Sequence, residues 1–95
     1  MASVTADIDA QNTFTSGLDV KGNFDLSISG TFVGTVTVQR SFDGGQNWLD
    51  VDTFTGPVET FGSQPTSAVY RVGIKTGDYT SGTASVALYD EDLSQ

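Results

Sequence analysis

Apolar and polar residues alternate along most of this chain, in short runs separated by glycine-containing segments. The clearest run spans residues 24–29, where Phe24, Leu26 and Ile28 fall on one side of an extended segment and polar residues fall on the other. A period of two is typical of a β-strand with one buried face. The same pattern indicates further strands at residues 13–20, 35–41, 48–54, 68–74 and 83–89.

Glycine and proline separate these runs at intervals typical of a β-sandwich. We expect a short edge strand at residues 58–61 and a loop at residues 62–66, because Gly62 and Pro65 interrupt the pattern. The sequence therefore predicts an all-β fold, a small antiparallel β-sandwich of six to seven strands. Since a cysteine pair is absent, the topology is left as immunoglobulin-like or jelly-roll-like. Turns are expected at residues 21–23, 30–34, 55–57 and 76–82.

The chain of 95 residues has the length of one domain. Residues 12–89 hold the alternating segments and form the predicted sandwich. Residues 1–11 are mostly polar, with Val4 and Ile8 as large apolar side chains, and predict an N-terminal arm or a weak edge strand. Residues 90–95 begin with three consecutive acids and predict an acidic tail.

Residues 41–48, with the sequence S-F-D-G-G-Q-N-W, join two alternating segments and predict a β-hairpin. Its tip is formed by Asp43, Gly44 and Gly45. The aspartate can accept hydrogen bonds from amides of its own turn, and the glycines can adopt a positive φ. Trp48, the only tryptophan, closes the turn, a position where packing is more common than stacking on a ligand.

The alternation places Arg40 on the same face as Val36 and Val38, where a guanidinium group needs a partner. We favour an ion pair with Asp50 or Asp52 on the returning strand, because opposed strand positions commonly pair opposite charges. The alternative is that the strand has reached the rim of the sheet at this point.

Twelve acidic and four basic residues give a formal net charge of -8. Nucleic acid is a poor partner for such a chain, because binding it needs a concentrated cationic surface. The charge is compatible with docking onto a basic neighbouring protein. The first residues lack the basic and apolar regions of a signal peptide, and no apolar run reaches membrane-spanning length. We therefore expect neither nucleic acid nor a membrane as a partner.

The chain contains neither histidine nor cysteine, which removes the usual general bases and thiolate ligands. A serine nucleophile would need Lys21 or Lys75 as its base, and neither lies in a recognisable motif. Asp43, Asp50, Asp52 and Glu59 could supply a carboxylate pair, but a chain this short leaves little room for a cleft. Asp50 and Asp52 share a face of their segment and Asp43 lies at the adjoining turn, so these three could bind calcium, but their spacing matches no dedicated loop. We predict a non-enzymatic protein with no catalytic residues, no cofactor and no metal site.

Residues 41–48 resemble the Asp-box of sialidases and related β-propellers, S-x-D-x-G-x-T-W. Ser41, Asp43, Gly45 and Trp48 match this motif, and Asn47 stands where threonine is usual. In that family the motif is a structural hairpin away from the active site, and it occurs in several copies. The single copy here implies the same turn design and no sialidase activity.

Residues 25–89 resemble small virion proteins of tailed bacteriophages, which are typically head decoration proteins or other accessory parts without catalysis. The resemblance implies localisation in the virion, with assembly in the host cytoplasm, and contact with the major capsid protein or other virion subunits. The segments that carry it are residues 26–31, 34–45, 70–72 and 81–86, together with Trp48 and Val51.

The expected function is thus that of a structural protein that decorates or cements the outer capsid surface and stabilises the head. We expect apolar residues of the arm, the loops and the strand edges to contact the partner: Val4, Ile8, Phe32, Val33 and Phe61. A minor tail component and a self-associating subunit are alternatives. A further alternative is a carbohydrate-binding or adhesion module, in which exposed aromatic rings would stack on a surface glycan: Trp48, Tyr70, Tyr79 and Tyr89.

Overall fold

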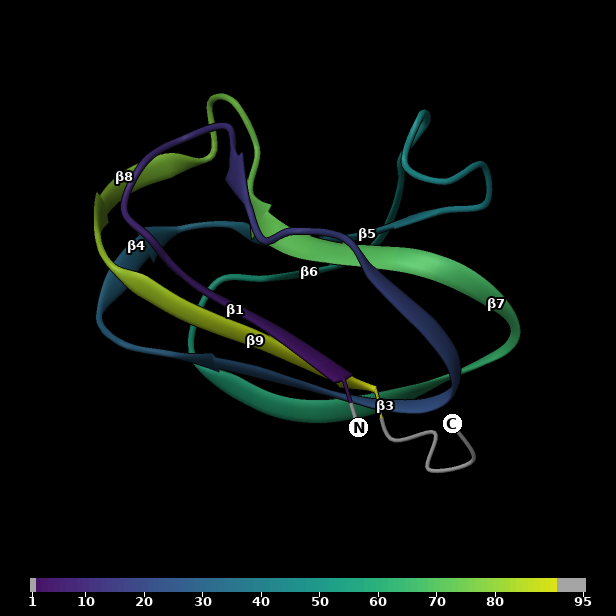
Figure 1. The fold of residues 1–95 in the computed structure, drawn as a ribbon. Coiled ribbons are helices and arrows are strands. Elements are labelled where there is room, and N and C mark those ends of the chain that lie inside the picture. The colour runs from purple at the N-terminus through teal and green to yellow at the C-terminus, as the bar shows by residue number, and fades with distance from the viewer. Residues whose placement is uncertain (1, 91–95) are drawn as a thin grey trace.

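Strands β3 (Leu18–Ser29) and β7 (Val58–Ile74) run side by side through both layers of the protein. The structure, a computed structural model, describes residues 2–90. The two strands pair antiparallel from Leu18 opposite Tyr70 to Ile28 opposite Val58. Figure 1 shows both strands curving together around the right-hand side of the molecule. A single sheet therefore supplies both layers of the fold.

The described residues form two antiparallel sheets and no helix, which confirms the predicted all-β sandwich. The main sheet has seven strands in the order β1-β9-β3-β7-β5-β6, with β2 beside β7, and β4 pairs with β8 in the second sheet. No helix within residues 2–90 could span a membrane. The remaining strands are β1 (Ala2–Ile8), β2 (Thr13–Phe14), β4 (Phe32–Gly34), β5 (Val36–Ser41), β6 (Leu49–Phe54), β8 (Tyr79–Gly82) and β9 (Ala84–Asp90).

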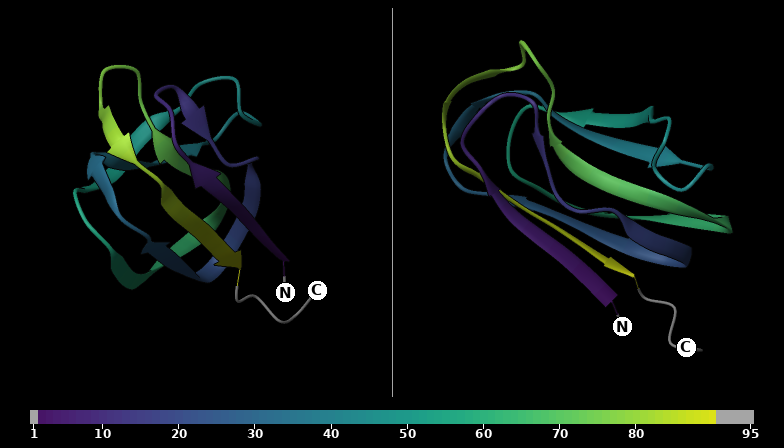
Figure 2. Two further views of the ribbon diagram at one scale, coloured as in Figure 1. Left: turned by 90° about the vertical axis from the view of Figure 1, so that its left-hand side faces the viewer. Right: turned by 45° about the horizontal axis from the view of Figure 1, so that its top comes forward.

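The hydrophobic core lies between the two layers. One layer contains β1, β9, most of β3 and the first half of β7, and the other contains β5, β6 and the second half of β7 (Figure 2, right). The inward positions expected from the alternation are confirmed in β3, β5, β7 and β9, because alternate side chains of a strand point to opposite faces. The buried core residues are Ile8, Leu18, Val20, Phe24, Leu26, Ile28, Val36, Val38, Ala68, Tyr70, Val72, Ile74, Ala84, Val86 and Leu88.

The sheet bends where β3 and β7 lose their regular register. Val20 pairs with Ala68, but Gly22, only two residues further along, pairs with Gln64. Lys21 therefore stands opposite three residues of β7. Additional residues on one strand of a pair bend the sheet locally, and here the bend carries both strands from one layer to the other.

Two expectations about this region are wrong. Residues 21–23 were expected to form a turn, and they belong to β3. Residues 58–61 were expected as a short edge strand, and they do form a strand that pairs with β3 alone. The loop expected at residues 62–66 is wrong, because these residues continue the same strand, β7. Pro65 lies in the irregular part of the ladder, where it has no paired position, so its missing amide does not interrupt the strand.

The N-terminal segment forms an edge strand rather than a separate arm. β1 pairs with β9 over its whole length, from Ala2 opposite Asp90 to Ile8 opposite Ala84. The side chain of Ile8 is fully buried in the core. Of the acidic tail predicted for residues 90–95, Asp90 ends β9 and the other residues lie outside the described part of the chain.

Candidate functional site

The loop between β5 and β6 is held by hydrogen bonds among its own residues, and it projects at the upper right of Figure 1. The Ser41 hydroxyl donates to Asp43 Oδ1 at 2.6 Å, and the same hydroxyl oxygen accepts the Gly45 amide at 2.9 Å. Asp43 Oδ1 also accepts the amides of Gln46 (3.1 Å) and Asn47 (2.9 Å), and its Oδ2 accepts Asn47 Nδ2 at 2.6 Å. The hydrogen bonds expected from Asp43 to its own turn are therefore present.

The hydrogen bonds of the loop affect the charge state of Asp43, and the two glycines allow the backbone conformation of the loop. The hydrogen bonds from Ser41 and Asn47 lower the pKa of the Asp43 carboxyl group well below its usual range. Gly44 and Gly45 adopt φ angles of 75° and 97°, as the sequence predicted, where a residue with a Cβ would be strained. The carboxylate serves the shape of the loop, since its oxygens are occupied by donors from the loop itself.

Trp48 packs on the outer face of the layer formed by β5, β6 and the second half of β7. The guanidinium carbon of Arg71 lies 4.3 Å from the centre of the Trp48 ring and 4.2 Å from the centre of the Phe14 ring. Contacts of this kind between a cation and an aromatic ring are favourable. The tryptophan ring thus holds an internal contact, as expected for a packed residue at the base of a hairpin.

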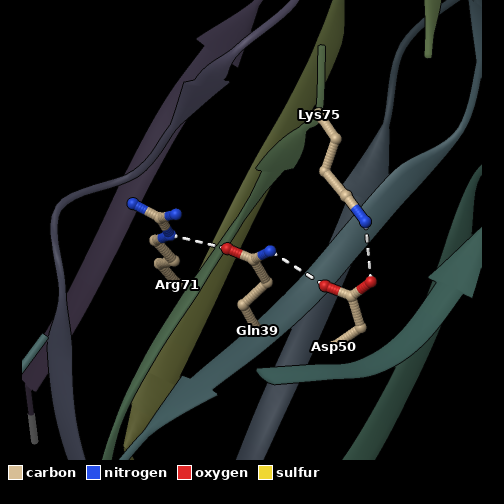
Figure 3. A network of polar contacts seen from close by, with 4 residues as sticks. All are labelled: Gln39, Asp50, Arg71 and Lys75. Carbon is tan, nitrogen blue, oxygen red and sulfur yellow. Dashed lines mark hydrogen bonds and ion pairs between the residues drawn. The ribbon is translucent and has the colours of Figure 1, made fainter. Parts of the chain in front are cut away.

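Arg71 on β7 begins a chain of polar contacts that passes through Gln39 on β5 and Asp50 on β6 to Lys75, the residue that follows β7 (Figure 3). Its Nε donates to Gln39 Oε1 at 2.8 Å, and Gln39 Nε2 donates to Asp50 Oδ1 at 2.8 Å. Lys75 Nζ lies 2.8 Å from Asp50 Oδ2. The hydrogen bonds from Lys75 and Gln39 lower the pKa of Asp50, and the contact with Asp50 raises the pKa of Lys75. The network links β5, β6 and β7 on their outer face.

Arg40 faces the inside of the sandwich, as expected, but its partner is not an aspartate. Its Nη1 donates to Gln64 Oε1 at 3.2 Å, and the Tyr70 hydroxyl donates to the same oxygen at 2.6 Å. Across the ladder, Arg40 stands opposite Leu49. The expected ion pair with Asp50 or Asp52 is therefore wrong, and a neutral amide accepts the hydrogen bond of the guanidinium group.

Asp43, Asp50 and Asp52 do not converge on a common point. The register of β5 and β6 shifts at Val51, so Asp50 stands opposite Gln39 and Asp52 stands opposite Val38. Because Gln39 and Val38 point to opposite faces, the two aspartates do as well. Within residues 2–90, no group of three acidic side chains is arranged to hold a metal ion. The shared face on which the calcium hypothesis depended does not exist.

The aromatic residues considered for glycan stacking are dispersed in the same way. Tyr70 is buried and packs on Phe24, with ring centres 4.7 Å apart. The Tyr79 hydroxyl donates to the Gly82 carbonyl at 2.9 Å, within β8. Tyr89 is half-buried on the outer face of the opposite layer, remote from Trp48 in the strand order. These rings do not form one exposed stacking face.

The residues predicted to contact a partner differ in how far their side chains are exposed. Ile8 is fully buried in the core, so its side chain is not available to a partner, and Val4 and Phe32 are half-buried against the core. Val33 and Phe61 are exposed, with 57% and 80% of their surface accessible. The contact that these residues were expected to make remains a prediction.

Two exposed apolar residues of the edge strand β6 were not among the predicted contacts. Leu49 is 55% exposed and Val51 is 42% exposed. Their position follows from β6 being the last strand in the order of the main sheet, so one of its edges is unpaired. In the sequence, β6 is recognisable as an alternating run between a tight hairpin and Gly56-Pro57. The alternation alone does not distinguish an edge strand from a central one.

An apolar groove of about 130 Å³ lies between β6 and the first half of β7. Core side chains form part of its lining, because the two layers are not closed by a strand along this flank. The lining residues are Phe24, Leu26, Val38, Val51, Asp52, Phe54, Thr60, Phe61 and Gly62. We refer to this groove together with the unpaired edge of β6 as the flank groove.

The comparisons with known proteins show a shared fold and nothing more specific. No family model and no curated protein matches this sequence. Two solved structures are similar: the crystal structure of FeII HppE, with a TM-score of 0.50, and hydroxypropylphosphonic acid epoxidase from S. wedmorenis in complex with fosfomycin, with a TM-score of 0.51. Each is 15% identical to this chain over 92% of its length, and this chain spans 42% of theirs.

Proposed function

We propose that this protein is a non-enzymatic structural subunit of a bacteriophage particle, which decorates the outer capsid surface and stabilises the head. The observation that carries the proposal is the flank groove. An exposed phenylalanine and an exposed valine line it, and core side chains reach its surface. Exposed apolar surface of this kind is typical of a site that another protein covers.

The chemistry of the described residues supports a binding role. The chain contains neither histidine nor cysteine. Of the acids considered as catalytic groups, Asp43 is engaged by its own loop and Asp50 by Gln39 and Lys75. Glu59 accepts a hydrogen bond from the Ser27 hydroxyl at 2.5 Å. The partners found for these three carboxylates are donors of the surrounding structure, which supports structural roles for them. The epoxidase activity named for the structural neighbour is therefore not proposed for this chain.

The net charge of -8 supports a partner with a basic surface. A lattice of capsid subunits would present such a surface many times, and a small rigid sandwich could then bind in many copies. Complementary charge raises the rate of association and disfavours contact between copies of the acidic protein itself.

The test is to purify phage particles from the genome that carries this gene, to separate their proteins on a gel, and to count copies of this chain against the major capsid protein. We expect a copy number comparable to that of the capsid subunits. A deletion of the gene is the matched comparison, and it should lower the temperature at which heads release DNA. A handful of copies would indicate a minor tail component, and absence from the particle would overturn the proposal.

A further inference from the structure

The flank groove has features that define the shape of what it binds. β6 is an edge strand, so a row of its backbone N–H and C=O groups has no partner strand among residues 2–90. Native proteins usually protect such an edge, and an extended segment of another chain can pair with it. Beside this edge the groove exposes Val51 and Phe61, 42% and 80% accessible. An added strand would satisfy the backbone groups and place alternate side chains in the groove.

The charges around the flank groove define the chemistry of the occupant. Asp52 lines the groove itself. On the other side of Phe61, Asp25 and Glu59 line a neighbouring depression on the outer face. No lysine or arginine lines either hollow. An occupant with Lys or Arg beside its apolar residues would therefore complement this rim.

Three of the four basic residues of the protein are engaged elsewhere, and the fourth, Lys21, is exposed on β3 and lines neither hollow. Lys75 pairs with Asp50, Arg71 contacts Phe14 and Trp48, and Arg40 donates to Gln64. A second copy of this chain would bring the same acidic rim against the first, within a protein of net charge -8. Repulsion between like charges disfavours that arrangement.

We propose that the flank groove binds an extended segment of a different protein, in which apolar residues alternate and Lys or Arg residues flank them. The segment adds to the free edge of β6 and inserts its apolar side chains between Val51 and Phe61. This inference adds the class of partner to the proposed structural role. It rests on that role in one respect only, namely that another protein binds at this flank.

The experiment uses the isotopically labelled protein and two synthetic peptides followed by NMR. In one peptide Val and Thr alternate between a Lys at each end, and in its twin Glu replaces Lys. We expect the Lys peptide to bind about tenfold more tightly at low salt, and the difference to shrink as salt rises. Resonances of Val51, Phe54 and Phe61 should shift, and amides of β6 should become protected from hydrogen exchange.

A pair of matched variants locates the binding site. Val51→Lys places a cation in the flank groove, whereas Thr80→Lys places the same cation at an exposed threonine of β8, which does not line the groove. We expect Val51→Lys to weaken binding of the Lys peptide about tenfold or more, and Thr80→Lys to leave it unchanged. Both variants should retain the melting temperature of the parent, because both side chains are exposed.

Four results would overturn the inference: no binding of either peptide, equal binding of both, an equal effect of the two variants, or dimers of the protein that form through β6. Its failure is distinct from failure of the proposed function. If the protein is abundant in particles but the peptides do not bind the groove, the structural role stands and docking occurs elsewhere. If the groove binds the Lys peptide but particles lack the protein, the groove stands and the phage role fails.

Discussion

The ring of Phe24 on β3 lies over Gly62, its direct partner residue on β7. A Cβ atom at position 62 would stand 2.6 Å from Phe24 Cζ, which is closer than two non-bonded carbon atoms can approach. The ring cannot move away easily, because it is buried and packs on Tyr70 with ring centres 4.7 Å apart. The glycine therefore provides the space that the aromatic pair occupies.

We predict that Gly62→Ala destabilises the protein by about 1–3 kcal/mol, the usual cost of forcing extra volume into a packed site. Urea unfolding followed by circular dichroism measures the change. Gly56→Ala is the control, since a Cβ there would meet no atom within 4 Å and its φ is not in the left-handed region. The control should be neutral or slightly stabilising. Equal stability of the two variants would show that the Phe24 ring can relax.

The stability of the hairpin loop should depend on pH through Asp43. The pKa of this carboxyl group is lowered in the folded protein, so the unfolded chain binds a proton first as the pH falls. Its stabilising contribution is complete above the unfolded pKa of about 4 and is lost progressively below it. Urea unfolding from pH 7 to pH 2 should show a steeper loss of stability for the parent than for Asp43→Asn. Parallel curves would contradict the role given to Asp43.

Arg71→Lys should destabilise the protein by about 1–2 kcal/mol although it keeps the positive charge. Lysine lacks the planar group that contacts the Phe14 and Trp48 rings and cannot reproduce the Nε hydrogen bond to Gln39. Trp48 is the only tryptophan, so its fluorescence reports the contact directly. We expect a shift of its emission in Arg71→Lys and none in Lys21→Arg, an exposed position on β3.

Gln64→Leu should cost about 2–4 kcal/mol, because it leaves the Tyr70 hydroxyl and the Arg40 guanidinium group without their acceptor in a buried place. Arg40 Nε is already buried without a hydrogen-bond partner among the described residues. Thermal unfolding measures the loss. Gln46→Leu changes the same side chain on the exposed loop and should alter the melting temperature little. A small effect at position 64 would mean that water replaces the amide.

The sequence was sufficient to predict the strands whose alternation is uninterrupted. The alternating apolar residues of β5 and β9 are buried as expected: Val36, Val38, Ala84, Val86 and Leu88. β7 was divided wrongly because Gly62 and Pro65 are typical of loops. The structure accommodates both, the glycine under Phe24 and the proline in the irregular ladder. Their roles depend on residues of β3 and could not be deduced from their neighbours in the chain.

The candidate site was predictable to a similar extent. The hairpin loop follows from local chemistry, since Ser41, Asp43 and the glycines interact within a few residues. The flank groove does not, because it depends on β6 being an edge strand and on the phase change at Val51. Val51 has no partner in β5, so the phase of β6 changes there and Asp52 lies on the inner side of the strand. The alternating sequence pattern around Val51 gives no sign of this change.

The pairing of β1 with β9 affects the order in which the strands can fold together. Among the described strands β1 precedes all others in the sequence and β9 follows them, and β9 is the only one of these strands that pairs with β1. During translation β1 must therefore remain without its partner until the seven intervening strands and β9 have been synthesised. Because contacts between distant parts of a chain form slowly, the docking of β1 is expected to be a late event in folding.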